Sequence, residues 1–104
     1  MKMYTGKVDI YYDNKIEKKL SSEKAIAIAF GRLALPIRER LSEFSVANNL
    51  EEISTNPPPR RHKLEGGNRW SVCVSKNFRI VFTGNDTDPK NVTSITIIDI
   101  IDYH

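Results

Sequence analysis

The chain has 104 residues, enough for one domain with one hydrophobic core, and 39% of them are apolar and 28% charged. No apolar run approaches the roughly 20 residues of a membrane-spanning helix, and Met1 to Lys7 lack the apolar segment of a secretion signal. One cysteine and two histidines make neither an internal disulfide nor a zinc motif. We therefore expect a single cytoplasmic domain over residues 1–104, without a cofactor or metal.

The net charge of +3 is unevenly distributed along the chain. Residues 57–82 carry six basic residues and one acidic residue, whereas residues 83–104 carry one basic and four acidic residues. A cationic segment attracts anionic partners, of which nucleic acid is the leading candidate. A solvated basic surface would explain the same charges.

Two short elements are predicted at the start of the chain. Residues 7–12 alternate apolar and polar side chains, which is typical of a half-buried strand. Asn14 and Glu17 have the spacing of a capping box, and Ile16 and Leu20 follow at helical spacing. We expect a short helix that begins at Asn14.

A longer apolar stripe follows, at spacings of three and four residues. It consists of Ile26, Ala29, Phe30, Leu33, Ile37, Leu41 and Phe44. Pro36 disfavours a continuous helix, so the stripe predicts helices over about 22–34 and 36–48, with Pro36 in the first turn of the second. Ser21 or Ser22 would cap the first. We interpret the stripe as core packing; a single kinked helix and a partner-binding groove are the alternatives.

The middle of the chain is predicted to connect helices to a sheet. Leu50 and Ile53 are expected to pack back onto the preceding helix. Residues 56–59, Asn-Pro-Pro-Pro, predict an extended, stiff connector.

The second half of the chain has strand character. We expect a short strand over 61–65, a turn at 66–68, and strands over 69–75 and 78–82 with a three-residue loop at 75–77. This register places Trp70, Val72, Val74, Phe78, Ile80 and Phe82 on one face, and Arg69, Ser71, Cys73 and Arg79 on the other.

Residues 92–101 predict one further strand. Its isoleucines occupy both faces, with Ile95, Ile97 and Ile101 opposite Ile98 and Ile100, as in a central strand covered on both sides. The sum is an α+β domain: an N-terminal strand and two to three helices packed on one face of a mainly antiparallel sheet. The other face, with Arg79 and the terminal His104, is left available.

Residues 60–104 contain a spaced pattern that resembles the RelE/ParE superfamily of type II toxins, specifically the HigB or "killer protein" branch. The pattern is His62-x-Leu64-x-Gly66, Arg69-Trp70-Ser71-Val72, Asn77-x-Arg79-Ile80-x-Phe82, and a β run that closes with Asp102-Tyr103-His104. The chain departs from the family where Glu65 replaces a basic residue that is often found there. The loop from Gly66 to Arg69 is also shorter and less basic than in many members.

The resemblance implies an mRNA endonuclease that acts in the ribosomal A site and is neutralised by a helix-turn-helix antitoxin, with DNA contacted only through that antitoxin. Carried over by position, the residues proposed to act in cleavage are His62, Arg79, Asp102, Tyr103 and His104. Arg60, Arg61, Lys63, Arg69 and Lys76 would hold the RNA backbone.

These residue types suit RNA cleavage without a metal. The reaction needs a base for the 2′-hydroxyl, an acid for the 5′-oxygen and positive charge at the phosphate. Histidine, with a reference pKa of about 6.5, suits proton transfer. We expect His62 and His104 to share these roles with Asp102 as orienting group or proton carrier, and Arg79 to meet the phosphate charge. Tyr103 would stack on a base or bind the phosphate.

Two other functions remain open at this stage. A ParE-like chain would poison gyrase by binding it, and a degenerate chain would only bind an antitoxin. The paired histidines favour the nuclease, because a binding module needs no proton-transfer groups.

Overall fold

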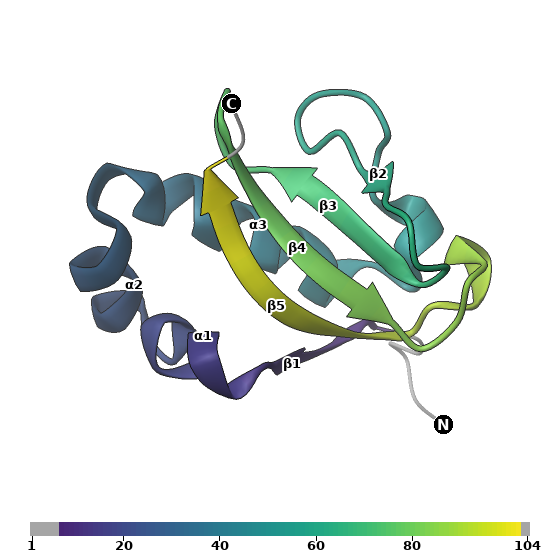
Figure 1. Ribbon diagram of the computed structural model, residues 1–104, viewed down its shortest axis with the longest axis horizontal. Coiled ribbons are helices and arrows are strands. Elements are labelled where there is room, and N and C mark those ends of the chain that lie inside the picture. Colours follow the sequence, from purple (N-terminus) through teal and green to yellow (C-terminus); the bar gives the residue numbers. More distant parts are fainter. Residues whose placement is uncertain (1–6, 103–104) are drawn as a thin grey trace.

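The structure, a computed structural model, describes residues 7–102. It is an α+β domain in which helices cover one face of a five-stranded sheet (Figure 1). The strands are β1 (Asp9–Tyr12), β2 (His62–Lys63), β3 (Arg69–Cys73), β4 (Phe78–Gly84) and β5 (Ser94–Asp102), and the helices are α1 (Asn14–Leu20), α2 (Glu23–Phe30) and α3 (Ala34–Val46). Short 3-10 turns lie at Gly31–Leu33, Leu50–Glu52 and Pro89–Asn91. No helix within residues 7–102 is long and apolar enough to cross a membrane.

The sheet is mainly antiparallel, as predicted. The strand order is β1-β5-β4-β3-β2, and the β1–β5 pair is parallel whereas the other three pairs are antiparallel. The parallel pair brings the start of the described chain beside its last strand. The helices between β1 and β2 therefore pack on one face, and the opposite face is turned toward the viewer in Figure 1.

The helices form where the apolar stripe predicts them. The two predicted helices are α2 and α3, separated by one 3-10 turn, and Pro36 lies in the first turn of α3. Ser22 caps α2, because its hydroxyl accepts a hydrogen bond from the Ala25 backbone N–H at 3.0 Å. The predicted cap of the first helix is wrong by one residue: Asp13, and not Asn14, accepts from the Lys15 N–H at 3.1 Å.

One hydrophobic core lies between the helices and the sheet. Ile37, Phe44, Leu50, Trp70 and Phe82 are fully buried within it. Ile53 is also buried, so residues 50–53 pack back onto the core as expected. The ring of Phe44 meets that of Phe82 edge to face, with centroids 5.0 Å apart. Trp70 thus belongs to the core, in agreement with the alternation of its strand.

The proline stretch was predicted to be extended, and this prediction is wrong. The backbone N–H of Arg60 donates to the Asn56 carbonyl at 2.9 Å, which closes a tight turn over residues 56–60. The Pro59 side chain is buried, and its carbonyl accepts from the Cys73 N–H at 2.7 Å. The bond within the turn and the bond to β3 together outweigh the preference of the isolated stretch for an extended helix.

The strand predicted over 61–65 is shorter in the structure. Only His62 and Lys63 pair with β3, opposite Ser71 and Trp70. The Arg61 N–H instead donates a hydrogen bond to the Ser54 carbonyl, at 2.8 Å. The turn predicted at 66–68 is present, and both of its glycines have positive φ.

The predicted β3–β4 hairpin is confirmed. Trp70 lies opposite Phe82 and Val72 opposite Ile80, so these four residues face the core together, as predicted. Cys73 lies opposite Arg79, which places both on the other face of the sheet. We call this the open face.

The predicted faces of β5 are wrong at its C-terminal half, because a β-bulge interrupts the strand. Val81 pairs with Asp99 but the next residue, Phe82, pairs with Ile97, so Ile98 is the extra residue. The bulge reverses the alternation. Ile101 lies opposite Arg79 on the open face, whereas Ile95 and Ile97 face the core. The strand is consequently not covered on both sides, and Ile101 remains half-buried.

Gly84, at the end of β4, supplies a test of the core. A Cβ built there would lie 2.9 Å from Val92 Cγ1 and 3.0 Å from Trp70 Cζ3. Val92 and Trp70 are both fully buried and have no space into which to move. We expect Gly84→Ala to lower the free energy of unfolding by about 1–3 kcal/mol through overpacking. Urea denaturation measures this loss, and Asn91→Ala, an exposed neighbour, should stay within about 0.5 kcal/mol.

Candidate active site

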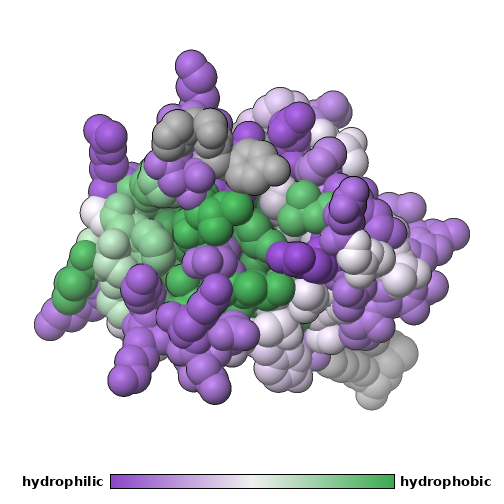
Figure 2. All heavy atoms as spheres, in the orientation of Figure 1, coloured by the Kyte–Doolittle hydropathy of each residue, from purple (hydrophilic) through white to green (hydrophobic). Residues whose placement is uncertain are grey.

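A pocket on the open face brings predicted site residues together. It has a volume of about 180 Å³, and three basic side chains line it: Arg60, His62 and Arg79. Ser71, Leu64, Val81 and Ile101 complete the lining. Figure 2 shows apolar surface across the middle of this face, surrounded by hydrophilic side chains. The pocket thus combines an apolar bed with two guanidinium groups and one imidazole, and we call it the His62 pocket.

His62 reaches the pocket because β2 pairs with β3. His62 lies opposite Ser71, so its side chain lies on the open face together with those of Ser71, Cys73 and Arg79. The hydrogen bond from the Leu64 N–H to the Arg69 carbonyl, 2.8 Å long, continues this pairing toward the glycine turn. The imidazole is exposed, so a bound molecule can reach it.

Arg79 is held in place by the hairpin that carries it. Its Nη1 lies 3.2 Å from the Ser75 and Lys76 carbonyls and 3.3 Å from the Phe78 carbonyl, and donates to them. These bonds tie the guanidinium to the β3–β4 loop and restrict its rotamers. A cation fixed in this way is suited to recognising an oxyanion.

Arg60 enters the pocket from the proline turn. Its φ of 53° places it in the left-handed region, which a residue other than glycine seldom adopts. The hydrogen bond from its N–H to Asn56 holds this conformation. Strained residues of this kind occur preferentially at functional sites.

The electrostatic character of the pocket follows from its lining. Two guanidinium groups line it, and among residues 7–102 no carboxylate does, so it favours an anion. Within the described part of the chain, no group of three or more His, Cys, Asp or Glu side chains is arranged to hold a metal ion.

The predicted C-terminal trio is described only at its first residue. Asp102 lies opposite Phe78 at the end of β5, and Phe78 packs against the core. The register thus gives Asp102 the face opposite to that of Arg79, although its position at the strand end leaves it exposed. Tyr103 and His104 lie outside the described residues.

Two of the predicted RNA-binding residues are engaged elsewhere. Arg61 Nε donates to the Ile53 carbonyl at 2.9 Å, and partial burial lowers the pKa of its guanidinium, an effect that Glu51 opposes. Lys63 lies opposite Trp70, and its Nζ donates to the Thr87 carbonyl at 2.9 Å. Both side chains therefore stabilise loops around the sheet.

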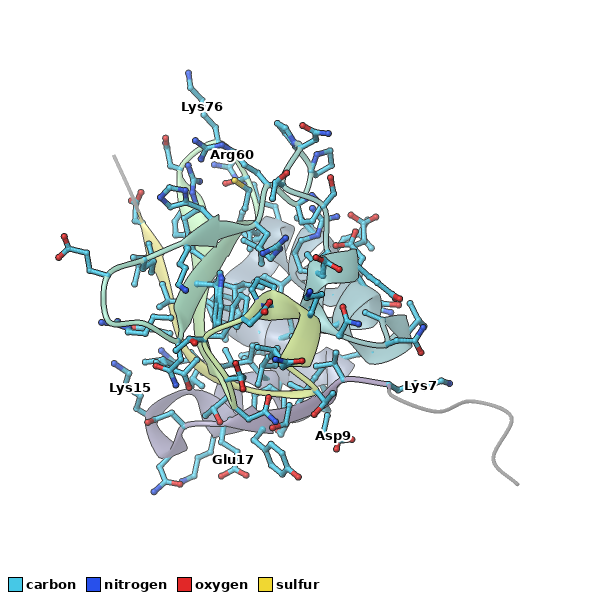
Figure 3. All side chains as sticks on the ribbon, turned by 90° about the vertical axis from the view of Figure 1, so that its right-hand side faces the viewer. Lys7, Asp9, Lys15, Glu17, Arg60 and Lys76 are labelled. Carbon is cyan, nitrogen blue, oxygen red and sulfur yellow. The ribbon has the colours of Figure 1, made fainter. Side chains whose placement is uncertain are left out.

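Of the other three predicted RNA-binding residues, Arg60 lines the His62 pocket, and Arg69 and Lys76 lie toward opposite ends of β3. Arg69 begins the strand and is exposed. Lys76 lies in the β3–β4 loop, and Figure 3 shows it at the same end of the molecule as Arg60. Of the two, only Lys76 is near the arginines of the His62 pocket.

Some lining residues were not singled out from the sequence. Ile101 reaches the pocket only because the bulge at Ile98 reverses its face, and no sequence signal marks that bulge. Asp99, also on the open face, forms an ion pair with Lys15 of α1 at 3.3 Å. The ion pair depends on the packing of α1 beside β5, which the sequence does not specify.

Comparison with known proteins bears on the fold. No protein-family model and no curated protein matches the sequence. Two solved structures from Staphylococcus aureus are similar. The structure of a YoeB dimer has a TM-score of 0.57 and 19% identity, covering 94% of this chain and 98% of that chain. A YoeB–YefM complex has a TM-score of 0.56 and 16% identity, covering 93% and 97%. The chain thus has a RelE/YoeB-like fold.

Proposed function

We propose that this chain is the toxin of a type II toxin–antitoxin system and cleaves mRNA in the ribosomal A site. The observation that carries the proposal is the His62 pocket, where an exposed imidazole and two arginines share one hollow on the open face. The RelE/YoeB-like fold adds support, since YoeB-like proteins with this fold are ribonuclease toxins. The HigB branch remains a prediction from the sequence motif, because the similar structures are YoeB chains.

The proposed reaction is an attack by the ribose 2′-oxygen on the adjacent phosphorus. A base removes the 2′-hydroxyl proton as the 2′-oxygen–phosphorus bond forms, and an acid protonates the 5′-oxygen as its bond to phosphorus breaks. His62 performs one of these transfers and His104 the other. Arg79 stabilises the charge that develops on the phosphate, and Tyr103 contacts the base or the phosphate.

A protein partner completes the proposal. One of the two similar structures is a complex of YoeB with YefM, which supports an antitoxin partner for this chain. The helix-turn-helix character of that antitoxin comes from the HigB resemblance. A short reading frame that encodes such a protein next to this one would support it.

Expression in a bacterial host tests the proposed function. Induction of the wild-type chain should arrest growth, and primer extension should reveal new 5′ ends within translated codons of cellular mRNA. His104→Ala should remove these ends. Intact transcripts with normal growth would refute the nuclease, and DNA damage without mRNA cuts would identify a ParE-like gyrase poison instead.

A further inference from the structure

A second hollow adjoins the His62 pocket on its arginine side. It has a volume of about 530 Å³ and is lined by Pro57, Pro58, Arg60, Cys73, Lys76 and Arg79, among others. We call it the proline groove. Arg60 and Arg79 line both hollows, so a single extended molecule can occupy the two together.

Both walls of the proline groove are fixed by hydrogen bonds. One wall is the turn over residues 56–60, which the Cys73 N–H ties to β3 through the Pro59 carbonyl. The other wall is the β3–β4 loop, whose Ser75 and Lys76 carbonyls accept from Arg79 Nη1. The groove therefore exists before a ligand arrives, which lowers the entropy cost of binding.

The chemistry of the lining selects the kind of ligand. Three cationic side chains line the groove, those of Arg60, Lys76 and Arg79, and its lining includes no acidic residue from the described part of the chain. Figure 3 shows Arg60 and Lys76 together at one end of the molecule. The exposed rings of Pro57 and Pro58 add an apolar wall. A ligand with an anionic backbone and flat apolar groups matches this combination.

The volumes of the two hollows indicate which part of such a ligand each can hold. Sites for small molecules usually measure about 300–1,000 Å³. At about 180 Å³ the His62 pocket is smaller than this range, whereas the proline groove at about 530 Å³ lies within it. The small pocket suits a phosphodiester and its ribose, and the groove has room for a whole nucleotide.

We propose that the proline groove is a second nucleotide subsite, which binds the nucleotide next to the cleaved phosphodiester of single-stranded RNA. This inference rests on the proposed RNA cleavage. Arg60 and Arg79 contact the phosphate shared by the two subsites, and Lys76 contacts the next phosphate. The base lies against Pro57 and Pro58.

Cys73 provides a direct test, because it lines the groove and is the only cysteine of the chain. Its side chain is partly exposed, so a thiol reagent can reach it. The protein is modified with either a small methylthio group or a bulky fluorescein maleimide. Cleavage of A-site mRNA on programmed ribosomes is then measured, and circular dichroism checks that each adduct remains folded.

The protein with the small adduct should cleave within about threefold of the unmodified rate. The protein with the bulky adduct should cleave at least about tenfold more slowly, because fluorescein fills the space of one nucleotide. Lys76→Ala should weaken binding of a non-cleavable 2′-O-methyl hexanucleotide, most strongly at low salt, whereas Lys90→Ala should not. Lys90 is an equally exposed lysine that does not line the groove.

The other outcomes separate the inference from the proposed function. If the folded bulky adduct cleaves as fast as the unmodified protein, the groove holds no nucleotide and the nuclease proposal still stands. Equal losses with both adducts also oppose the subsite, because a methylthio group leaves the groove nearly empty. If the unmodified protein cuts nothing, the proposed function fails and the subsite fails with it.

Discussion

Replacement of His62 by alanine should lower the rate of mRNA cleavage on the ribosome by about 10²–10⁴-fold. This is the usual contribution of one general acid or base. The imidazole lines the His62 pocket but is exposed, so its removal opens no cavity in the core. The free energy of unfolding should change by no more than about 0.5 kcal/mol. Single-turnover cleavage measures the first effect and urea denaturation the second.

A chemical control separates a catalytic role of His62 from a positional one. Because the site is open to solvent, added imidazole should enter the space left in His62→Ala and restore part of the rate. Lys90→Ala, an exposed substitution outside the pocket, should cleave like the wild type. Undiminished cleavage by His62→Ala would remove this histidine from the mechanism and leave the pocket without its proton-transfer group.

The second large effect is expected at Arg79. Arg79→Ala should reduce cleavage by about 10²–10³-fold, the range measured when a preorganised donor to a developing oxyanion is removed. It should also destabilise the fold by roughly 1–3 kcal/mol, because the side chain donates to three carbonyls around the β3–β4 loop. Cleavage and unfolding are therefore measured on the same variant.

Arg79→Lys distinguishes the two contributions. Lysine keeps the positive charge, but it lacks the planar guanidinium group of arginine, which can donate to the loop carbonyls and to the phosphate at the same time. We expect it to recover most of the stability and only part of the cleavage rate. Arg38→Ala removes one arginine from a surface ion pair with Glu23 and should leave both quantities nearly unchanged. Full cleavage by Arg79→Ala would contradict the proposed phosphate contact.

The features read correctly from the sequence are those that depend on local periodicity. The spacing of Ile26, Ile37 and Phe44 predicts helices, and the alternation of Trp70 and Val72 predicts which face of β3 is buried. Each pattern reflects the geometry of its own backbone, with 3.6 residues per turn or two residues per pleat. The hairpin could be placed because its loop length fixes the register of both strands.

The features that the sequence does not reveal depend on contacts between distant segments. The turn over residues 56–60 is held against β3 because the Cys73 N–H donates to the Pro59 carbonyl. The Arg61 side chain does not line the pocket of the open face, because its Nε donates to the Ile53 carbonyl. Neither partner is adjacent in the chain. A run of basic residues therefore predicts a cationic surface but not which of its members face the same hollow.

By itself, the sequence determined the α+β architecture, the buried faces of β3 and β4, and the small set of residues suited to acid–base chemistry on RNA. Only the tertiary structure decided that His62 and Arg79 share a pocket with Arg60, and that a bulge at Ile98 turns Ile101 toward them. The reason is physical: periodicity is a property of one backbone segment, whereas register and turn closure depend on which segments bond to one another.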